Sequence, residues 1–359
     1  MGQGERIDKS LLQTFVPVNS LTGDHLDRLL DQQQVRSYSS GEALFTIGDQ
    51  DNTTIYLLSG QVELEDAAGN KQVIGAGGVE SWHPIDHYQP RRSTARALTD
   101  VSVVHFDSFR LDTILSWDQS AGYVILDINS NAAYQEDREW MIRLLRSKLF
   151  YQVPPGNILE IFRRLKSLRY KAGDKVIEQG EDADCCYIIK DGICEVSVFA
   201  AGASESTPVA MLEAGQWFGE EALLSGKPRN ATITMATDGV LMRLDRKDFD
   251  ELLREPIVSN VDAEQALERV ACGARWLDVR TPDEFEQHHL AGALNLPLNV
   301  LRMKSRLLDP QRVYVACCDT GRRSASAAFL LKNVGIEVYV LEGGLNGSAG
   351  ALESNMEED

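Results

Sequence analysis

The chain has 359 residues and a formal net charge of −18, with 43% hydrophobic and 25% charged residues. This length predicts two or three domains, each large enough to bury its own core. The acidic balance argues against a nucleic-acid-binding surface, because phosphate contacts need clustered lysine and arginine. No apolar run reaches the length needed to span a bilayer, and residues 1–10 lack the pattern of a signal peptide. We therefore expect neither a nucleic-acid partner nor a membrane anchor.

Six cysteines include two adjacent pairs, and none has the Cys-x-x-Cys spacing of many metal and redox sites. This usage predicts free thiols in a reducing compartment. We therefore expect a cytoplasmic protein that binds no metal.

The N-terminal two thirds of the chain repeat themselves, with residues 40–64 matching residues 172–196. Three glycine pairs recur at a constant offset of 132 residues: Gly41 and Gly173, Gly48 and Gly180, and Gly60 and Gly192. A constant offset indicates an internal duplication. Each copy shows short alternating strands broken by Gly and Asp turns, which predicts an antiparallel β-roll or barrel. Helices are predicted before the copies, at residues 24–33 and 157–166.

The second copy contains the sequence FGEEALLSGKPRNA at Phe218–Ala231. Gly219 allows the backbone to approach an anion, so that main-chain N–H groups can point at phosphate oxygens. Glu220 supplies a carboxylate suited to a ribose hydroxyl, and Arg229 supplies the fork of donors that suits a phosphate. This order of residues resembles the phosphate-binding cassette of cyclic-nucleotide-binding domains, as in protein kinase regulatory subunits and catabolite-activator-type bacterial receptors.

The resemblance implies a cyclic nucleotide as ligand and a protein of bacterial type. Cyclic AMP is favoured over cyclic GMP, because in the family a hydroxyl just after the arginine helps to bind guanine, and Asn230 stands there. The implied nucleotide-binding residues are Phe218, Gly219, Glu220, Glu221, Ala222, Arg229, Asn230 and Ala231.

The first copy differs at this pocket, where it reads GGVESWHPI at residues 77–85 and PRRSTA at residues 90–95. Glu80 is a candidate substitute for the ribose carboxylate, but it lies in a different local sequence. We interpret four nearby residues as structural or surface residues: His83, His87, Arg91 and Arg92. The first copy is therefore predicted to be a degenerate module that keeps the fold without the ligand.

Beyond the repeat, the pattern changes to alternating helices and strands. After a helix at residues 247–254, strands are predicted at residues 276–279, 313–317 and 338–341, and helices at residues 262–269, 298–307 and 324–331. This alternation of helices and strands is typical of a small α/β domain with a parallel sheet. The acidic residues 353–359 are expected to be frayed.

The α/β region contains the most enzyme-like sequence of the chain, CDTGRRS at Cys318–Ser324, between a predicted strand and a predicted helix. A thiol at this place lies among backbone N–H groups at a helix N-terminus, with Arg322 and Arg323 nearby. Each of these features favours the thiolate and is expected to lower the pKa of Cys318. Such a thiolate can attack a sulfane sulfur and then hold it as a persulfide.

The pattern Cys-x-x-Gly-x-Arg-Ser resembles the active-site loop of rhodanese sulfurtransferases. Other segments resemble the flanking signatures of this family: Leu277–Arg280, Glu284 with Phe285, His289–Ala293 with Asn295 and Pro297, and Glu342–Gly344. Ser348 departs from the pattern, because the family often has Trp there. The resemblance covers residues 258–347.

The resemblance implies that Cys318 carries the sulfur. The implied catalytic residues are Cys318, Asp319, Thr320, Gly321, Arg322 and Arg323. Asp278 and Arg280 would brace this loop, whereas His289 and the neighbouring thiol of Cys317 are interpreted as structural. A small sulfur donor and an unidentified thiol acceptor are the expected partners. Related folds also host Cys-x5-Arg phosphatases and arsenate reductases, and Cys317 with Arg323 fits that spacing, so phosphoryl chemistry is a minor alternative.

The sequence therefore predicts two β-roll modules with flanking helices and a small α/β domain. The predicted ranges are 1–116 for the degenerate module, 117–150 for a helical connector, 151–256 for the nucleotide-binding module, 257–347 for the rhodanese domain and 348–359 for an acidic tail. The connector helix, at residues 135–150, packs on one module or forms a homodimer. The predicted function is a nucleotide-regulated sulfurtransferase. The alternative is a cyclic AMP receptor whose rhodanese domain senses persulfide or docks a partner, with little turnover.

Overall fold

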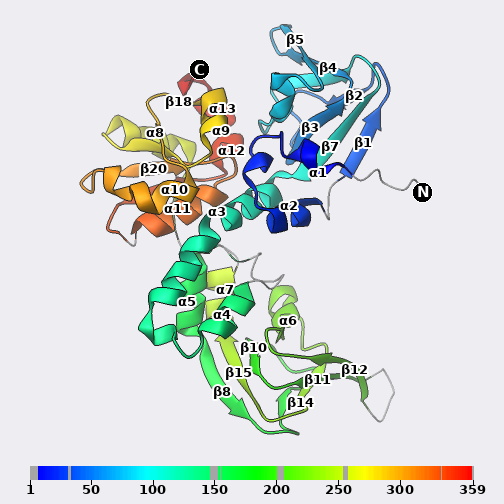
Figure 1. The fold of residues 1–359 in the computed structure, drawn as a ribbon, viewed down its shortest axis with the longest axis vertical. Helices are drawn as coiled ribbons and strands as arrows, with labels where there is room; N and C mark the ends of the chain where they lie inside the picture. The colour runs from blue at the N-terminus through cyan, green and yellow to red at the C-terminus, as the bar shows by residue number, and fades with distance from the viewer. Residues whose placement is uncertain are drawn as a thin grey trace. The chain divides into compact units, whose positions relative to one another are not determined.

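In the computed structural model the chain forms two compact units, Met1–Ala121 with Val258–Asp359, and Gly122–Ile257. The first unit contains the first β-rich module and the C-terminal α/β domain, and the second unit contains the second β-rich module (Figure 1). The structure describes residues 7–30, 34–145, 153, 155–199, 206–253, 258–332 and 334–357. The predicted fold class is confirmed, since two β-rich modules with helices precede a domain with a parallel sheet.

The first module is a roll of two antiparallel sheets, with strand orders β1-β7-β3 and β2-β6-β4-β5. Alternating apolar side chains such as Ile55, Leu57 and Val62 are buried between the sheets. Its strands are β1 (Gln34–Tyr38), β2 (Ala43–Phe45), β3 (Thr53–Ser59), β4 (Gln61–Asp66), β5 (Lys71–Gly75), β6 (Ser93–Ala97) and β7 (Val101–Asp107). Its helical elements are α1 (Lys9–Leu12), η1 (Val18–Ser20), α2 (Gly23–Leu30) and η2 (Val79–Trp82).

Helix α3 (Ser108–Ser130) follows β7 directly. Leu111 and Leu115 on its first half pack with residues of α1 and α2 in one apolar cluster. The connector predicted from residue 117 therefore starts inside this helix. Neither α3 nor any other helix of the described residues is apolar enough over a sufficient length to cross a membrane.

The second module repeats the roll, with strand orders β13-β10-β15-β8 and β12-β11-β14-β9. Its strands are β8 (Lys166–Tyr170), β9 (Lys175–Ile177), β10 (Cys185–Asp191), β11 (Cys194–Val198), β12 (Thr207–Leu212), β13 (Trp217–Phe218), β14 (Thr232–Met235) and β15 (Gly239–Asp245). Its helical elements are η3 (Ala132–Tyr134), α4 (Arg138–Leu145), η5 (Pro155–Asn157), α5 (Ile158–Arg164), α6 (Glu220–Ser225) and α7 (Arg246–Leu253). Residues 146–150 of the helix predicted at 135–150 lie outside the described residues.

The repeated glycines are needed where the hairpins turn. Gly60 and Gly192 occupy equivalent turns, with φ of 86° and 93°. A Cβ atom on Gly60 would lie 2.4 Å from the carbonyl oxygen of Asp100, and one on Gly192 would lie 2.9 Å from that of Asp238. Only glycine fits these positions without strain, which explains the constant spacing in the sequence.

The C-terminal domain is built on a parallel sheet with strand order β16-β21-β20-β17-β19. Leu301 of α10 and Leu331 of α11 belong to one apolar cluster of this domain, and Ala266 of α8 and Leu352 of α13 belong to another. Its strands are β16 (Ser259–Val261), β17 (Arg275–Asp278), β18 (His289–Leu290), β19 (Leu294–Asn295), β20 (Tyr314–Cys317), β21 (Val338–Leu341) and β22 (Met356–Glu357). Its helical elements are α8 (Ala263–Ala271), α9 (Pro282–Gln287), α10 (Leu298–Lys304), η6 (Ser305–Leu307), α11 (Arg322–Lys332), α12 (Gly344–Gly347), α13 (Ala349–Leu352) and η7 (Glu353–Asn355).

The expectation of a frayed acidic tail is wrong for residues 353–357. Helix α13 precedes them, and β22 pairs with β18 through Met356 and Leu290. Leu352 is fully buried in a cluster that also contains Trp276. Apolar side chains within the acidic segment hold it on the domain, because burying them outweighs the cost of ordering a few residues.

Replacing Leu352 with alanine should destabilise the C-terminal domain by about 2–5 kcal/mol, because the change leaves a cavity in a closed core. Pulsed hydrogen exchange of the β17 amides across a urea series measures the unfolding midpoint of this domain. Leu307→Ala is the matched control, since Leu307 is 74% exposed. Equal midpoints for the two variants would contradict the packing of the C-terminal segment.

Candidate functional site

The predicted phosphate-binding loop of the second module forms a tight turn into helix α6. Gly219 precedes the helix with φ of 87°, and Gly226 ends it with φ of 67°. A Cβ atom on Gly219 would lie 2.7 Å from Nη1 of Arg229. Glycine therefore serves two purposes here, because it permits the left-handed backbone and leaves room for the arginine.

The Arg229 side chain is buried behind this turn, with the residue 5% exposed. Its Nη1 donates to the carbonyl oxygen of Gly219 at 2.7 Å, and its Nη2 donates to that of Cys185 at 2.7 Å. The carboxylate of Asp184 lies 3.6 Å away on a side chain that is 70% exposed. Because water screens so exposed a carboxylate, this ion pair is weak, and Arg229 is held mainly by the two carbonyl groups.

Two acidic residues occupy the first turn of α6. Glu220 is half-buried, and burial raises the pKa of its carboxyl, with Glu221 adding to the effect and Arg229 opposing it. Glu221 instead accepts a hydrogen bond from Nδ2 of Asn230 at 2.5 Å. Asn230 thus ties the arginine segment to the helix through Glu221, and Glu220 takes no part in this bond.

The first module has a different arrangement at the equivalent place. Gly48 donates to the carbonyl of Arg91 at 2.9 Å, as Gly180 does to that of Arg229, so Arg91 is the structural counterpart of Arg229. The interpretation of Arg91 as a surface cation is wrong. Its guanidinium is fully buried, and Nη2 donates to both carboxylate oxygens of Asp51, at 2.7 and 3.0 Å. A carboxylate of the same module therefore already pairs with this arginine.

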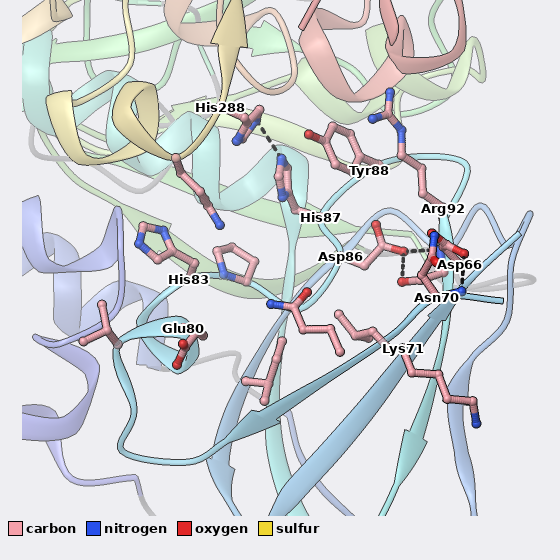
Figure 2. Close-up of a pocket in the computed structure, with 17 residues that line it drawn as sticks. Asp66, Asn70, Lys71, Glu80, His83, Asp86, His87, Tyr88, Arg92 and His288 are labelled. Carbon is pink, nitrogen blue, oxygen red and sulfur yellow. Dashed lines mark hydrogen bonds between the residues drawn. The ribbon is translucent and has the colours of Figure 1, made fainter. Parts of the chain in front are cut away.

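A cavity of about 520 Å³ opens beside this part of the first module (Figure 2). Glu80 lines it, as do His83, His87, Arg92 and His288. Nε2 of His87 and Nε2 of His288 are 3.0 Å apart. Burial lowers the pKa of His87 to about 3, so this ring is neutral near pH 7. Arg92 also differs from the expected surface cation, because it donates to the carbonyl of Ala349 at 2.9 Å.

The predicted sulfur-carrying loop follows strand β20 and precedes helix α11. Backbone N–H groups of Gly321 and Ser324 donate to Sγ of Cys318, at 3.2 and 3.4 Å, and the Ser324 hydroxyl lies 3.1 Å from the sulfur. Gly321 has φ of 90°. The turn and the helix start therefore aim several donors at one sulfur atom. Cys318 itself is fully buried.

A network of buried ions surrounds this loop. Arg280 binds Asp278 at 2.7 Å and Asp319 at 3.2 Å, so it connects the end of β17 to the loop. Arg323 binds both carboxylate oxygens of Glu284, at 2.7 and 2.8 Å. The structure thus brings Asp278 and Arg280 to the loop. Arg322 is oriented elsewhere, with its guanidinium 5.6 Å from the ring of Phe109.

The network also receives a carboxylate from the first module. Asp112 of α3 accepts from the hydroxyl of Thr320 at 2.5 Å and from Nε of Arg323. Its Oδ2 lies 3.4 Å from Sγ of Cys318. The sequence analysis did not find Asp112. The one available signal was an acidic residue within the apolar stretch FRLDTIL, on the side of the helix that is buried.

The sequence analysis also assigned no role to Glu284. A signal for its position existed, because Thr281 and Glu284 have the spacing of a capping box. Oγ1 of Thr281 and Oε2 of Glu284 are 2.7 Å apart, and the same carboxylate accepts from the Thr281 amide at 2.9 Å. This capping box fixes the position of the Glu284 carboxylate, which binds Arg323.

The expectation of a lowered thiol pKa is wrong for this arrangement. Burial raises the pKa of Cys318 to about 12, and the carboxylate of Asp112 adds to the effect, whereas Arg323 and Ser324 oppose it. Burial also raises the pKa of Asp319 to about 7, with Glu284 and Asp112 acting in the same direction. The donors around the sulfur are present, but desolvation and negative charge outweigh them.

A family model for the cyclic nucleotide-binding domain matches residues 35–116 and 167–255, and one for the rhodanese-like domain matches residues 262–351. The chain is 34% identical over 140 residues to the cAMP-dependent protein kinase regulatory subunit of Dictyostelium discoideum, across 39% of this chain and 40% of that protein. It is 28% identical over 237 residues to the corresponding subunit of Emericella nidulans, across 64% of this chain and 53% of that protein. The chain therefore matches about half or less of the length of these relatives.

Among solved structures, the regulatory domain of Toxoplasma gondii PKA with cAMP aligns at 20% identity with a TM-score of 0.31. The alignment covers 68% of this chain and 90% of that one. The relatives named here are eukaryotic. A bacterial type therefore stays a prediction.

The raised pKa predicts that alkylation of Cys318 by iodoacetamide accelerates about tenfold per pH unit from pH 7 to pH 10, without a plateau. An ordinary thiol levels off above a pKa of about 8.5. Peptide mass spectrometry at several times measures the rate, and the denatured protein supplies the reference curve. A plateau below about pH 10 in the folded protein would contradict the account of burial and negative charge.

Proposed function

The chain contains two cyclic nucleotide-binding domains and a C-terminal rhodanese-like domain, and we propose from this that it is a cyclic-AMP-regulated sulfurtransferase. The nucleotide half of the proposal depends on Arg229, a buried cation beside the first turn of α6. The sulfur half depends on Cys318, whose sulfur faces the amides of Gly321 and Ser324. Six free cysteines support a reducing, cytoplasmic location.

Nucleotide binding would use the phosphate first. Arg229 offers a charge-assisted contact to a phosphate oxygen, and the amides at the start of α6 add donors to it. Glu220 would accept a hydrogen bond from a ribose hydroxyl. Because burial raises the pKa of Glu220, this contact would weaken as the pH falls, and at a higher pH than for an ordinary carboxyl. The first module would bind no cyclic nucleotide, since Asp51 already neutralises Arg91.

Sulfur transfer would proceed through a persulfide on Cys318. The thiolate attacks the sulfane sulfur of a donor such as thiosulfate, and a new S–S bond forms while the donor S–S bond breaks. The electron pair of the broken bond leaves with sulfite. An acceptor thiolate then attacks the outer sulfur, and Cys318 leaves as the thiolate. The amides around Cys318 would hold the negative charge of the persulfide.

A second candidate function is favoured by one observation. Cys318 is fully buried, and its pKa is raised to about 12 by burial. At pH 7 the thiolate is then a fraction on the order of 10⁻⁵. Such a thiol suits a cyclic AMP receptor whose rhodanese domain senses persulfide or docks a partner with little turnover. Phosphoryl chemistry is less well supported, because Sγ of Cys317 faces the carbonyl oxygen of Leu277, whereas the loop amides donate to Cys318.

Arg229→Ala should abolish cyclic AMP binding measurable by calorimetry, because an unpaired anion in a buried site costs about 3–5 kcal/mol. The wild-type protein should bind one nucleotide per chain, with cyclic AMP preferred over cyclic GMP. Arg169→Ala is the matched control in the same module, since Arg169 is exposed on β8. Unchanged affinity in Arg229→Ala would refute the assignment of the pocket, and two nucleotides per chain would refute the empty first module.

Treatment with thiosulfate should add one sulfur atom to the protein, and Cys318→Ser should lose it. Cys317→Ser should retain it, because Cys317 faces the core rather than the loop donors. Intact-mass and peptide mass spectrometry distinguish these outcomes. Sulfur retained in Cys318→Ser, or lost in Cys317→Ser alone, would count against the assignment of the sulfur carrier.

A further inference from the structure

A carboxylate of the first module occupies the place where the rhodanese-like loop would receive an anion. Asp112 accepts from the Thr320 hydroxyl and from Nε of Arg323, and its Oδ2 is 3.4 Å from Sγ of Cys318. These contacts use three loop groups that the proposed sulfur transfer needs. Asp112 thus has the charge and the contacts of a bound anionic donor.

Little room is left for a real donor. A cavity between the first module and the loop, lined by Asp112, Asp319 and Thr320 among others, has a volume of only about 20 Å³. This volume holds one water molecule at most. Thiosulfate has five non-hydrogen atoms and cannot enter beside Asp112. The outer sulfur of a persulfide would also compete with this carboxylate for space.

The charges around the sulfur of Cys318 also disfavour an anion at this place. Four carboxylates, those of Asp112, Asp278, Glu284 and Asp319, share two guanidinium groups, those of Arg280 and Arg323. Asp112 is the only one of the four that comes from outside the C-terminal domain. Adding a thiolate or a persulfide anion to this excess of negative charge is unfavourable. Withdrawing Asp112 would reduce the excess of negative charge around the sulfur.

Several contacts hold the first module in this position. The hydroxyls of Ser116 on α3 and Ser326 on α11 are 2.8 Å apart and buried. His87 contacts His288, and Arg92 donates to the carbonyl of Ala349. The carboxylate therefore belongs to a docked surface and not to a single side chain that happens to lie nearby.

We propose that Asp112 is an internal inhibitor: it fills the anion position of the Cys318 loop, so a sulfur donor enters only when α3 separates from that loop. The proposal rests on the proposed sulfurtransferase function for the identity of the donor. It assigns the first module a role that needs no nucleotide of its own. Its duplicated fold serves to carry α3 and the segment that contains His87 and Arg92.

Asp112→Asn tests the charge, because asparagine keeps the shape and removes the negative charge. The rate of Cys318 alkylation at pH 7.5, divided by that of the exposed Cys272 in the same protein, should rise at least about tenfold. Asp118→Asn is the matched control, since Asp118 lies on the same helix and contacts His25 and Thr22 instead. An unchanged ratio in Asp112→Asn would overturn the proposal.

A disulfide tests the separation independently of that variant. Ser116→Cys combined with Ser326→Cys places two thiols where the hydroxyls are 2.8 Å apart, close enough to bridge. The oxidised protein should take up sulfur from thiosulfate at least tenfold more slowly than the reduced and then reductant-free protein. Sulfur uptake at the same measurable rate in both forms would overturn the proposal.

The two proposals fail in different ways. If alkylation rises in Asp112→Asn but neither variant nor wild type takes up sulfur, the inhibitory role stands and the sulfurtransferase function falls. If wild type takes up sulfur as fast as Asp112→Asn and the alkylation ratio is unchanged, the inhibitory role falls and the sulfurtransferase function stands.

Discussion

The arrangement of the C-terminal site depends on the pairing of one buried cation, Arg323. Its guanidinium is fully buried and binds carboxylates from three parts of the chain: Glu284 of α9, Asp319 of the loop and Asp112 of α3. A charge removed from water is tolerable only when it is paired and hydrogen-bonded, so Arg323 fixes these three segments relative to one another. The same pairing affects Cys318, because one of the carboxylates that bind Arg323, that of Asp112, lies 3.4 Å from the sulfur and raises its pKa. The loop around Cys318 is thereby held with the carboxylate of Asp112 beside the sulfur.

The pairing of a buried arginine also differs between the two cyclic nucleotide-binding domains. Arg91 and Arg229 occupy equivalent positions in the two rolls, and both are buried. Arg91 donates two bonds to the carboxylate of Asp51 in addition to bonds to neutral oxygens, whereas Arg229 is held mainly by neutral carbonyl groups. A guanidinium that is paired with a carboxylate offers little net charge to a ligand. One that is bonded to neutral carbonyl groups offers most of its charge. The duplication has kept the arginine in both copies, with different acceptors around it in each copy.

Much of this fold could be predicted from the sequence, because its signals are local. Positive-φ glycines such as Gly60 and Gly192 reveal the duplicated turns, and the cassette and the Cys318 loop each lie within about a dozen residues. The contact of Asp112 with Cys318 joins residues 206 positions apart, and no local pattern encodes it. The error about the pKa of Cys318 has the same origin. The donors that favour the thiolate are neighbours in sequence, whereas burial and the opposing carboxylate come from packing against another module.

The account joins a nucleotide-binding module and a sulfur-carrying loop in one regulated protein, and allostery between them requires that the nucleotide favour one of two states of the loop. The most direct measurement is the rate of sulfur transfer from thiosulfate to an acceptor thiol, with and without saturating cyclic AMP, on the same full-length sample. The account predicts that transfer occurs and that cyclic AMP changes its rate. It predicts no change in a sample with Arg229→Ala. Transfer at one rate in all of these samples, or no transfer in any of them, would contradict it.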